Sequence, residues 1–357
     1  MESLKELREG VTTGTCAAAA TAAAALVLTR GEVPPVVTVD TPSGPRSLEV
    51  SWARLEEDGA RASVIKDAGD DPDVTHGMAV QSFVRRRQGD FYLDGGEGVG
   101  TVTKPGLKVA VGEKAINPVP RAQILAELRR YLPQGGEAVI SIPGGEEVAH
   151  KTYNPRLGIV GGLSILGTKG VVRPMSEEAL RATFKADLDV KVAAGNLDLV
   201  YTFGNMGEEM ALRALGIGAE RIVQVGNEIG YMLKEAHRAG VKHLTIAGHS
   251  GKLVKVAAGV FQTHSAVADA RREVMMALAA LEGAPYEVLA GLDGCTTTES
   301  MGALLKAWDE EKAHHLWQVA ARRAAERACS YLWGDIPCDA VIFDNEGCVL
   351  GTTLTRS

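Results

Sequence analysis

The stretch LDLVYTFGNMGEEMALRAL, residues 197–215, decides the fold class of the second half of the chain. Its apolar start predicts a strand over Leu197–Phe203, its glycines predict a turn at Gly204–Gly207, and its end predicts a helix over Glu208–Leu215. The same order of strand, glycine turn and helix follows twice more, beginning at Arg221 and at His243. This repetition is typical of a doubly wound, mostly parallel α/β sheet, in which ligands lie at the carboxyl ends of the strands.

The first half of the chain shows a different pattern, with short apolar runs separated by turns. Arg46–Trp52 alternates polar and apolar residues, which is the period of a half-buried strand. An alanine-rich run over Ala17–Leu28 precedes these segments and favours a helix. We therefore expect an α+β domain with a largely antiparallel sheet.

Two domains and a C-terminal extension are expected, because 357 residues exceed what one hydrophobic core usually serves. The expected parts are an α+β domain over 1–153, an α/β domain with strand-end glycine turns over 154–295, and helices with a closing hairpin over 296–357, which pack on the preceding domains.

The composition limits the kinds of partner. The net charge of −7 argues against general nucleic-acid binding, which requires a basic face. No apolar run reaches the roughly 20 residues that span a bilayer, and the first residues lack the basic leader of a signal peptide. The five cysteines show no C-x-x-C spacing, so a reducing cytoplasm fits best. We expect a cytoplasmic protein that binds neither nucleic acid nor membrane.

The segment REGVTTGTCAAAA, residues 8–20, predicts the N-terminus of the alanine-rich helix, capped by Thr13 or Thr15. Such a terminus offers unpaired N–H groups and the positive end of a helix dipole to a carboxylate or phosphate. Lys104 and Arg121, which lie in glycine- and proline-rich segments, could also meet an anion. The alternative for the terminus is a well-capped, tightly packed helix without a ligand.

An acidic loop, KDAGDDPDVTHG at residues 66–77, is the second dense motif. Its four carboxylates and its imidazole could bind a hard cation or hold a general base. The alternative is a loop rich in Asx turns, in which the acids bond to their own backbone. A metal-dependent hydrolase or phosphotransferase that uses Asp67–His76 is therefore one alternative function.

Five glycines fall within residues 158–170, which is costly for regular structure. They imply a close approach of the backbone, either to another chain segment in a buried crossover or to a ligand. The ligand is favoured here, because the segment leads into the doubly wound sheet.

Together these motifs closely resemble the CbiD family, the cobalt-precorrin-5B C(1)-methyltransferases of anaerobic cobalamin biosynthesis. The resemblance rests on blocks that cover almost the whole chain in order: Gly10–Ala20, Lys66–Gly77, Gly95–Leu107, Ile116–Arg121, Asn154–Gly170, Gly204–Ala211 and Gly248–Lys255. Two places depart from the family pattern: residues 226–229, where Ser-Asn-Phe-Ile is expected, and Ser250, where an apolar residue is expected. Both departures bear on ligand contacts at that rim of the sheet.

The resemblance implies that S-adenosylmethionine, as a co-substrate, donates a methyl group to C1 of the tetrapyrrole cobalt-precorrin-5B, and that the product is cobalt-precorrin-6A. Cobalt would then belong to the substrate, and the protein itself would hold no metal. A non-catalytic tetrapyrrole-binding protein is the other alternative. The oligomeric state stays open, with a homodimer as one option.

The resemblance and the motifs together give candidate roles for individual residues, in a cleft expected between the two domains. The catalytic candidates, for proton management or pocket shape, are Asp67, Asp70, Asp71 and His76. The candidates for holding substrate carboxylates are Thr12, Thr13, Thr15, Lys104, Arg121, His249 and Lys252. The candidates for binding the cofactor, at the strand ends, are Gly161, Gly162, Gly204, Asn205, Asn227 and Gly230.

Overall fold

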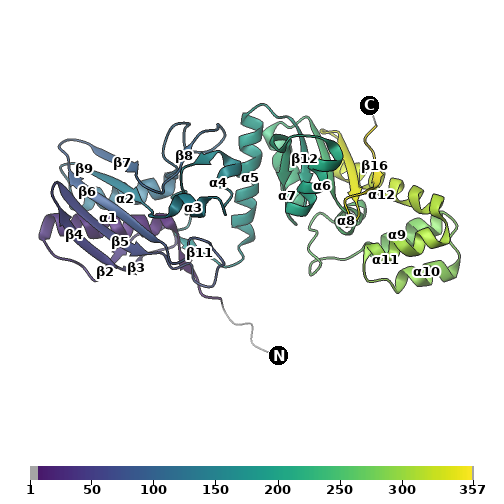
Figure 1. Ribbon diagram of the computed structural model, residues 1–357, viewed down its shortest axis with the longest axis horizontal. Coiled ribbons are helices and arrows are strands. Elements are labelled where there is room, and N and C mark those ends of the chain that lie inside the picture. The colour runs from purple at the N-terminus through teal and green to yellow at the C-terminus, as the bar shows by residue number, and fades with distance from the viewer. Residues whose placement is uncertain (1–6, 356–357) are drawn as a thin grey trace. The chain divides into compact units, whose positions relative to one another are not determined.

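The computed structural model describes residues 7–355. Contacts divide the chain into two compact units, Met1–Glu177 and Glu178–Ser357, each with its own five-stranded sheet (Figure 1). The first is an α+β unit and the second a doubly wound α/β unit, which confirms the predicted fold class. Within residues 7–355, no helix combines the length and the apolar character that crossing a bilayer requires.

The sheet of the first unit has the strand order β4-β5-β6-β9-β7. Its strands are β4 (Trp52–Glu56), β5 (Gly59–Ile65), β6 (Ala79–Arg86), β7 (Phe91–Gly95) and β9 (Gly136–Ser141). All neighbouring pairs are antiparallel except β7 with β9, which are parallel. The prediction of a largely antiparallel sheet is therefore confirmed. The smaller elements around it are a hairpin of β2 (Val36–Val39) with β3 (Arg46–Glu49), α3 (Gly145–Ala149) and α4 (Asn154–Leu157).

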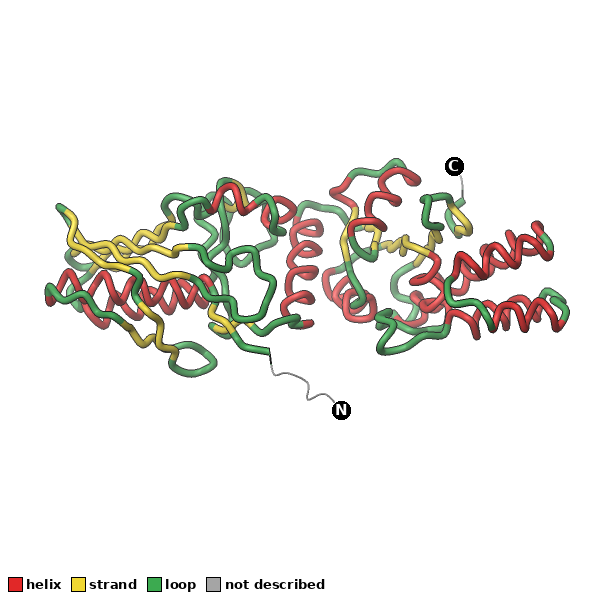
Figure 2. Tube along the Cα trace, turned by 60° about the horizontal axis from the view of Figure 1, so that its bottom comes forward, coloured by secondary structure: helices red, strands yellow, loops and turns green. Residues whose placement is uncertain are grey.

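Helix α1 (Thr13–Arg30) packs on β5 and β6, and α2 (Pro118–Tyr131) packs on α1 (Figure 2). The alanines of α1 are small, and those from Ala17 to Ala25 are fully buried. Small side chains let the helix backbone lie close to the sheet, so the core here is built on close approach and not on bulky residues. The helix ends at Gly31, whose φ of 71° is the left-handed conformation that favours glycine.

The cap of α1 is Thr12, and the prediction of Thr13 or Thr15 is wrong. Thr12 has an extended backbone, and its Oγ1 accepts a hydrogen bond from the backbone N–H of Thr15 at 3.2 Å. Thr13 and Thr15 already lie inside the helix, where their hydroxyls bond elsewhere. Thr13 Oγ1 donates to the carbonyl of Ser164 at 3.2 Å, and Thr15 Oγ1 donates to the carbonyl of Gly170 at 2.7 Å.

The glycine-rich segment 158–170 belongs to the first unit by its contacts. β10 (Ile159–Val160) pairs with β8 (Thr101–Val102), and β11 (Val171–Val172) pairs with β1 (Gly10–Val11). The sequence patterns assign residues 154–177 to the second domain instead. The predicted domain ranges, 1–153, 154–295 and 296–357, stay a prediction. These short pairs and the threonine bonds show a buried crossover of chain segments, the alternative that the sequence analysis did not favour.

The sheet of the second unit has the strand order β13-β12-β14-β15-β16. Its strands are β12 (Asp198–Thr202), β13 (Ile222–Gln224), β14 (His243–His249), β15 (Cys338–Phe343) and β16 (Val349–Thr352). The first four run parallel, and β16 turns back antiparallel on β15 as the predicted closing hairpin. Pairing between β15 and β14 joins this hairpin to the sheet, a placement that the sequence did not decide.

The helices of the second unit follow the strands in the doubly wound order. They are α5 (Glu177–Ala193), α6 (Asn205–Leu215), α7 (Ile229–Ala239), α8 (Ser250–Ala257), α9 (Arg271–Leu281), α10 (Tyr286–Asp293), α11 (Thr298–Trp308) and α12 (Glu310–Tyr331). Thr297 caps α11 and forms a capping box with Ser300. Asp309 caps α12, which is why α11 stops at Trp308.

The buried hydroxyl of Thr15 provides a stability test of the crossover. Thr15→Val removes the shorter of the two hydrogen bonds to the carbonyl of Gly170 and leaves only the Thr12 backbone N–H at 3.3 Å, so we expect the free energy of unfolding to fall by about 1 kcal/mol. Thr29→Val is the matched control, because Thr29 Oγ1 bonds only within its own helix, and a change of about 0.5 kcal/mol or less is expected. Urea denaturation measures both; equal losses in the two variants would contradict this account.

Candidate functional site

The parallel sheet of the second unit contains one topological switch point, between β12 and β14. From β12 the chain passes to β13 on one side, and then to β14 on the other side. The segments that leave the carboxyl ends of β12 and β14 therefore diverge, and they leave a crevice at this edge of the sheet. In open α/β sheets this is the place where ligands bind.

A cavity of about 390 Å³ lies at this edge, and we call it the basic crevice. Its walls come from the segment after β12, from the start of α8 after β14, from α9 and from the start of α11. The residues that line it are Phe203, Met206, Gly207, Met210, His249, Gly251, Lys252, Lys255, Ser265, Arg271, Thr297, Thr298, Glu299 and Asn345. Three basic side chains, Lys252, Lys255 and Arg271, and one carboxylate, Glu299, are among these lining residues.

Neutral oxygens fix the two lysines of the basic crevice. Lys252 Nζ donates to Asn227 Oδ1 at 2.7 Å, and Lys255 Nζ donates to the carbonyls of Thr263 and Ala268 at 3.2 and 3.0 Å. Lys255 is only 2% exposed. Burial, together with the charges of Lys255 and Arg271, lowers the pKa of Lys252. Among the residues that the structure describes, Lys252 forms no ion pair, so it contributes positive charge to the crevice.

Arg271 has a partner of its own at the start of α9. Its Nε donates to Asp269 Oδ1 at 2.8 Å, and this bond lowers the pKa of Asp269 and raises the pKa of Arg271. The pair holds the guanidinium in place beside the lysines, and Asp269 itself does not line the crevice.

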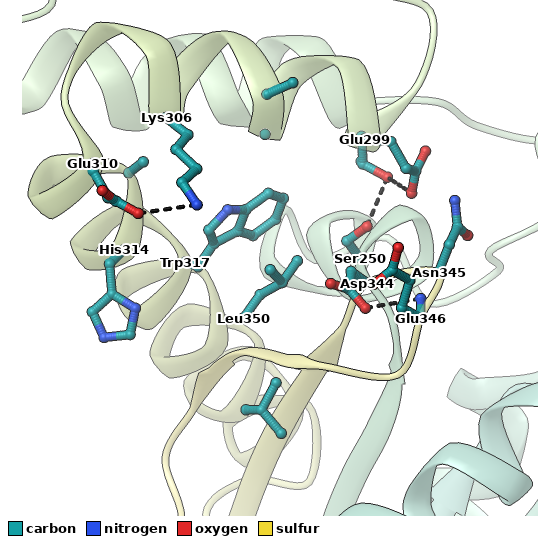
Figure 3. A pocket seen from close by; sticks show the side chains of 15 residues that line it. Ser250, Glu299, Lys306, Glu310, His314, Trp317, Asp344, Asn345, Glu346 and Leu350 are labelled. Carbon is teal, nitrogen blue, oxygen red and sulfur yellow. Dashed lines mark hydrogen bonds and ion pairs between the residues drawn. The ribbon is translucent and has the colours of Figure 1, made fainter.

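A second cavity, of about 520 Å³, adjoins the first, and we call it the Trp317 cavity (Figure 3). It is bounded by α11, by α12 and by the turn between β15 and β16. The residues that line it are Ser250, Thr298, Glu299, Gly302, Ala303, Lys306, Glu310, Ala313, His314, Trp317, Asp344, Asn345, Glu346, Val349 and Leu350. Both cavities have volumes typical of small-molecule sites.

The wall between the two cavities is formed by the three residues that line both, Thr298, Glu299 and Asn345. His249 Nδ1 accepts a hydrogen bond from the backbone N–H of Gly251 at 3.1 Å, so a neutral His249 carries its proton on Nε2. That nitrogen lies 2.7 Å from Glu299 Oε1. Burial raises the pKa of Glu299, but its own backbone N–H and the adjacent His249 outweigh burial and lower it. The wall thus keeps an ionised carboxylate beside an imidazole.

The predicted residues of the second unit lie around the basic crevice, but only two of them line it. His249 and Lys252 do so, from the end of β14 and the start of α8. Asn227 reaches it only through its bond to Lys252, and Asn205 Oδ1 accepts from Gln224 at 2.9 Å. Gly204 has a φ of 105° and open space where a Cβ would stand.

Packing explains two of the predicted cofactor glycines without a ligand, and backbone conformation explains a third. A Cβ on Gly230 would lie 2.9 Å from the side chain of Phe261, and one on Gly162 would lie 2.3 Å from the carbonyl oxygen of Gly98. Gly161, with a φ of 79°, follows β10 directly. Gly161 and Gly162 therefore do not lie at the end of a parallel strand, and that predicted placement is wrong. Their role toward a cofactor stays a prediction.

The predicted substrate residues of the first unit divide into two kinds. The hydroxyls of Thr12, Thr13 and Thr15 are buried and bond to protein groups, as described above. Lys104 is exposed, its stem packed on Gly158, and Arg121 is half-buried in the first turn of α2. Their contacts with a substrate stay predictions.

The acidic loop, residues 66–77, bonds to itself and to the preceding segment. Asp67 forms a bidentate pair with Arg8, and Asp70 Oδ2 accepts from the Arg8 backbone N–H at 2.8 Å. Asp71 Oδ2 accepts from the Met175 backbone N–H at 3.3 Å, and His76 Nδ1 accepts from that of Ala68 at 3.1 Å.

The fourth carboxylate of the loop, Asp73, bonds to a buried lysine of the same loop, because Lys66 Nζ donates to Asp73 Oδ2 at 2.7 Å. This is the self-bonded loop given above as the alternative. Within residues 7–355, no group of three His, Cys, Asp or Glu side chains could hold a metal ion, so the metal-dependent alternative finds no support there. The catalytic role of the four loop residues stays a prediction.

Sequence reasoning missed Lys255, Arg271, Glu299 and Trp317. A signal was present for Lys255, because it follows Lys252 by three residues on a predicted helix, a spacing that puts both on one face. Arg271, Glu299 and Trp317 come from three later helices, and only the tertiary fold brings them to the strand ends.

Comparisons with known proteins cover nearly the whole chain. Residues 1–174 match the family model described as CbiD, and residues 262–354 match that of the CbiD C-terminal domain. A cobalt-precorrin-5B C(1)-methyltransferase from Moorella thermoacetica is 46% identical, over 98% of this chain and 95% of that protein. One of the same name from Thermoanaerobacter sp. is 49% identical, over 85% of this chain and 84% of that protein. A crystal structure of the cobalamin biosynthesis protein cbiD from Archaeoglobus fulgidus is 34% identical and covers 75% of this chain and 84% of that chain, with a TM-score of 0.41.

The pair of Asp67 with Arg8 predicts a specific pH dependence of stability. Bonds from Arg8 and from the Gly69 N–H lower the pKa of Asp67 from 3.8 to about 2 in the folded chain. The stabilisation is therefore complete above the unfolded pKa and is lost as the pH falls from about 4 to about 2. The difference in unfolding free energy between the wild type and Asp67→Asn should be constant above about pH 5 and shrink toward pH 2.

Arg8→Gln removes the partner and should reproduce this pH dependence, which chemical denaturation across the pH range measures for both variants. A difference that stays constant down to pH 2 would contradict the assigned pair.

Proposed function

The chain belongs to the CbiD family and is a C-methyltransferase, and we propose that it transfers the methyl group of S-adenosylmethionine to C1 of cobalt-precorrin-5B, giving cobalt-precorrin-6A. The relatives named above carry the substrate and the methylated carbon in their names. The cobalt is part of the tetrapyrrole and needs no protein ligands of its own.

One observation carries the proposal for where the reaction takes place. Two adjoining cavities, each large enough for a small molecule, lie at the carboxyl edge of the parallel sheet, one of them at its switch point, and share one wall. A transfer between two substrates needs such an arrangement, because both must bind at once with their reacting atoms close together. We therefore place methyl transfer at the strand ends of the second unit.

The reaction depends on how the two substrates are positioned and needs no nucleophile from the protein. The electron pair of the new C–C bond comes from the conjugated macrocycle, and the electron pair of the broken C–S bond stays on sulfur, so that S-adenosylhomocysteine leaves. Holding the sulfonium methyl in line with C1 can supply roughly 7–11 kcal/mol of the barrier. The residues of the two cavities then act by binding and orienting the two substrates.

We place the reaction in a reducing compartment, the cytoplasm, because all five cysteines are free thiols.

Cys16 is buried in the core of the first unit, where burial raises its pKa to about 12. A thiol that is protonated and shielded in this way takes no part in catalysis.

Calorimetric titration with S-adenosylhomocysteine, the demethylated product, tests the proposed donor. We expect saturable binding at one site per chain, since the product keeps the nucleoside and the amino-acid part of the donor. Adenosine triphosphate is the control ligand and should not compete. If the chain bound no S-adenosylhomocysteine at millimolar concentration, either alone or with a tetrapyrrole present, the proposed donor would be wrong.

A further inference from the structure

The two cavities of the second unit differ sharply in charge. The basic crevice is lined by Lys252, Lys255 and Arg271 and by one carboxylate, Glu299; Asp269, which does not line it, pairs with Arg271. The Trp317 cavity presents four carboxylates, from Glu299, Glu310, Asp344 and Glu346, against the single ammonium group of Lys306. Adjoining cavities of opposite charge favour ligands of opposite charge.

The two substrates of the proposed reaction differ in the same sense. The tetrapyrrole carries acetate and propionate side chains and is a polyanion. S-adenosylmethionine carries a sulfonium and an ammonium group against one carboxylate and is a cation. On the basis of the proposed function, we propose that the Trp317 cavity binds the S-adenosyl cofactor and that the basic crevice binds a carboxylate of the tetrapyrrole.

The Trp317 cavity offers the groups that a cationic nucleoside requires. The indole of Trp317 lies between the Lys306–Glu310 pair on one side and Ser250 with Glu299 on the other (Figure 3). Trp317 is only 4% exposed, so its indole contributes an apolar part of the cavity lining and not an open stacking face. The apolar side chains of Ala303 and Leu350 complete a surface suited to the flat part of such a ligand.

The carboxylates of this cavity are not equivalent. Glu310 Oε1 accepts from Lys306 Nζ at 3.0 Å, and Asp344 Oδ1 accepts from the backbone N–H groups of Glu346 and Cys348 at 2.9 and 2.8 Å. Glu346 is exposed in the turn between β15 and β16, and its carboxylate has no ion-pair partner within the described part of the chain. Glu346 is therefore the acid most available to a cationic ligand.

The basic crevice is built to receive an anion. Lys255 is held by two backbone carbonyls and Lys252 by a side-chain amide, so both ammonium groups are fixed without being neutralised. Burial and the charge of Arg271 lower the pKa values of both lysines; the charge of Lys255 lowers that of Lys252 further, while Asp269 partly opposes the effect at Lys255. A bound carboxylate would relieve the repulsion between these positive charges and would form charge-assisted hydrogen bonds.

The shared wall places the two ligands next to each other. A ligand that fills the Trp317 cavity and one that enters the basic crevice would both touch Thr298, Glu299 or Asn345. The methyl group would then pass along this wall, beside His249 and Glu299. In the reverse assignment, the carboxylate of the cofactor would bind in the basic crevice, and loss of Lys252 would then weaken the binding of S-adenosylmethionine.

Filling the Trp317 cavity with a larger side chain tests whether the S-adenosyl cofactor binds there. Ala303→Trp places a large side chain in the cavity, and Ala307→Trp, an exposed alanine of the same helix outside the cavity, is the matched control. Titration with S-adenosylmethionine should give a dissociation constant at least about tenfold higher for Ala303→Trp, with Ala307→Trp within about twofold of the wild type. Equal affinities in all three proteins would overturn the assignment.

Two further variants test which ligand binds in which cavity. Glu346→Gln should weaken S-adenosylmethionine more than S-adenosylhomocysteine, because only the former carries the sulfonium charge. Lys252→Met should weaken uroporphyrin III, a tetrapyrrole polycarboxylate, at least about fivefold and reduce the salt dependence of its binding, with exposed Lys242→Met as control. If Lys252→Met instead weakened S-adenosylmethionine and left uroporphyrin III unchanged, the reverse assignment would hold.

These outcomes separate the inference from the function on which it rests. A wild-type protein that bound neither S-adenosylmethionine nor S-adenosylhomocysteine would contradict the proposed function itself. A wild type that bound both, with Ala303→Trp unaffected, would leave the function standing and overturn only the assignment of the cavities. Thermal unfolding of each variant, with midpoints close to that of the wild type, excludes misfolding as the cause of lost binding.

Discussion

The parallel pairing of β12 with β14 is the constraint on which the candidate site depends. Five residue pairs, from Asp198 with His243 to Thr202 with Ala247, fix the register of these strands. Because the strands are parallel neighbours, their carboxyl ends meet at one edge, where α6 begins after Gly204 and α8 begins after His249. The two segments diverge at that edge, and the space between them becomes the basic crevice. The parallel addition of β15 brings the turn before β16 to the same edge and adds the second cavity beside the first.

Local sequence patterns were sufficient for most of the fold. Repeated strand, glycine turn and helix predicted the doubly wound sheet, and alternating residues predicted the antiparallel sheet of the first unit, because both patterns record which faces are buried. The cap of α1 was missed, because Thr12, Thr13 and Thr15 lie close together and each could cap the helix. The crossover at residues 158–170 was not favoured, because a glycine needed for contact with Gly98 looks the same in sequence as one needed for a ligand.

The candidate site was only half visible in the sequence. His249 and Lys252 follow directly from the end of a predicted strand, and the rule that ligands bind at strand ends finds them. Glu299 and Trp317 lie on α11 and α12, and no local pattern says which face of those helices turns to the sheet. The acidic loop was predicted as catalytic from its composition, but two of its carboxylates form ion pairs with Arg8 and Lys66. The bonds of this loop match the self-bonded alternative, while its catalytic role stays a prediction. The two cavities are lined by residues scattered over the second unit.

The most direct test of the central claim follows the methyl group itself. The purified protein would be incubated without oxygen with cobalt-precorrin-5B and with S-adenosylmethionine labelled with carbon-13 in its methyl group, and the product would be examined by nuclear magnetic resonance and mass spectrometry. The account predicts one new labelled methyl group, attached to C1 of the macrocycle, with S-adenosylhomocysteine formed in equal amount. An unlabelled product, or a label on any other carbon, would contradict it.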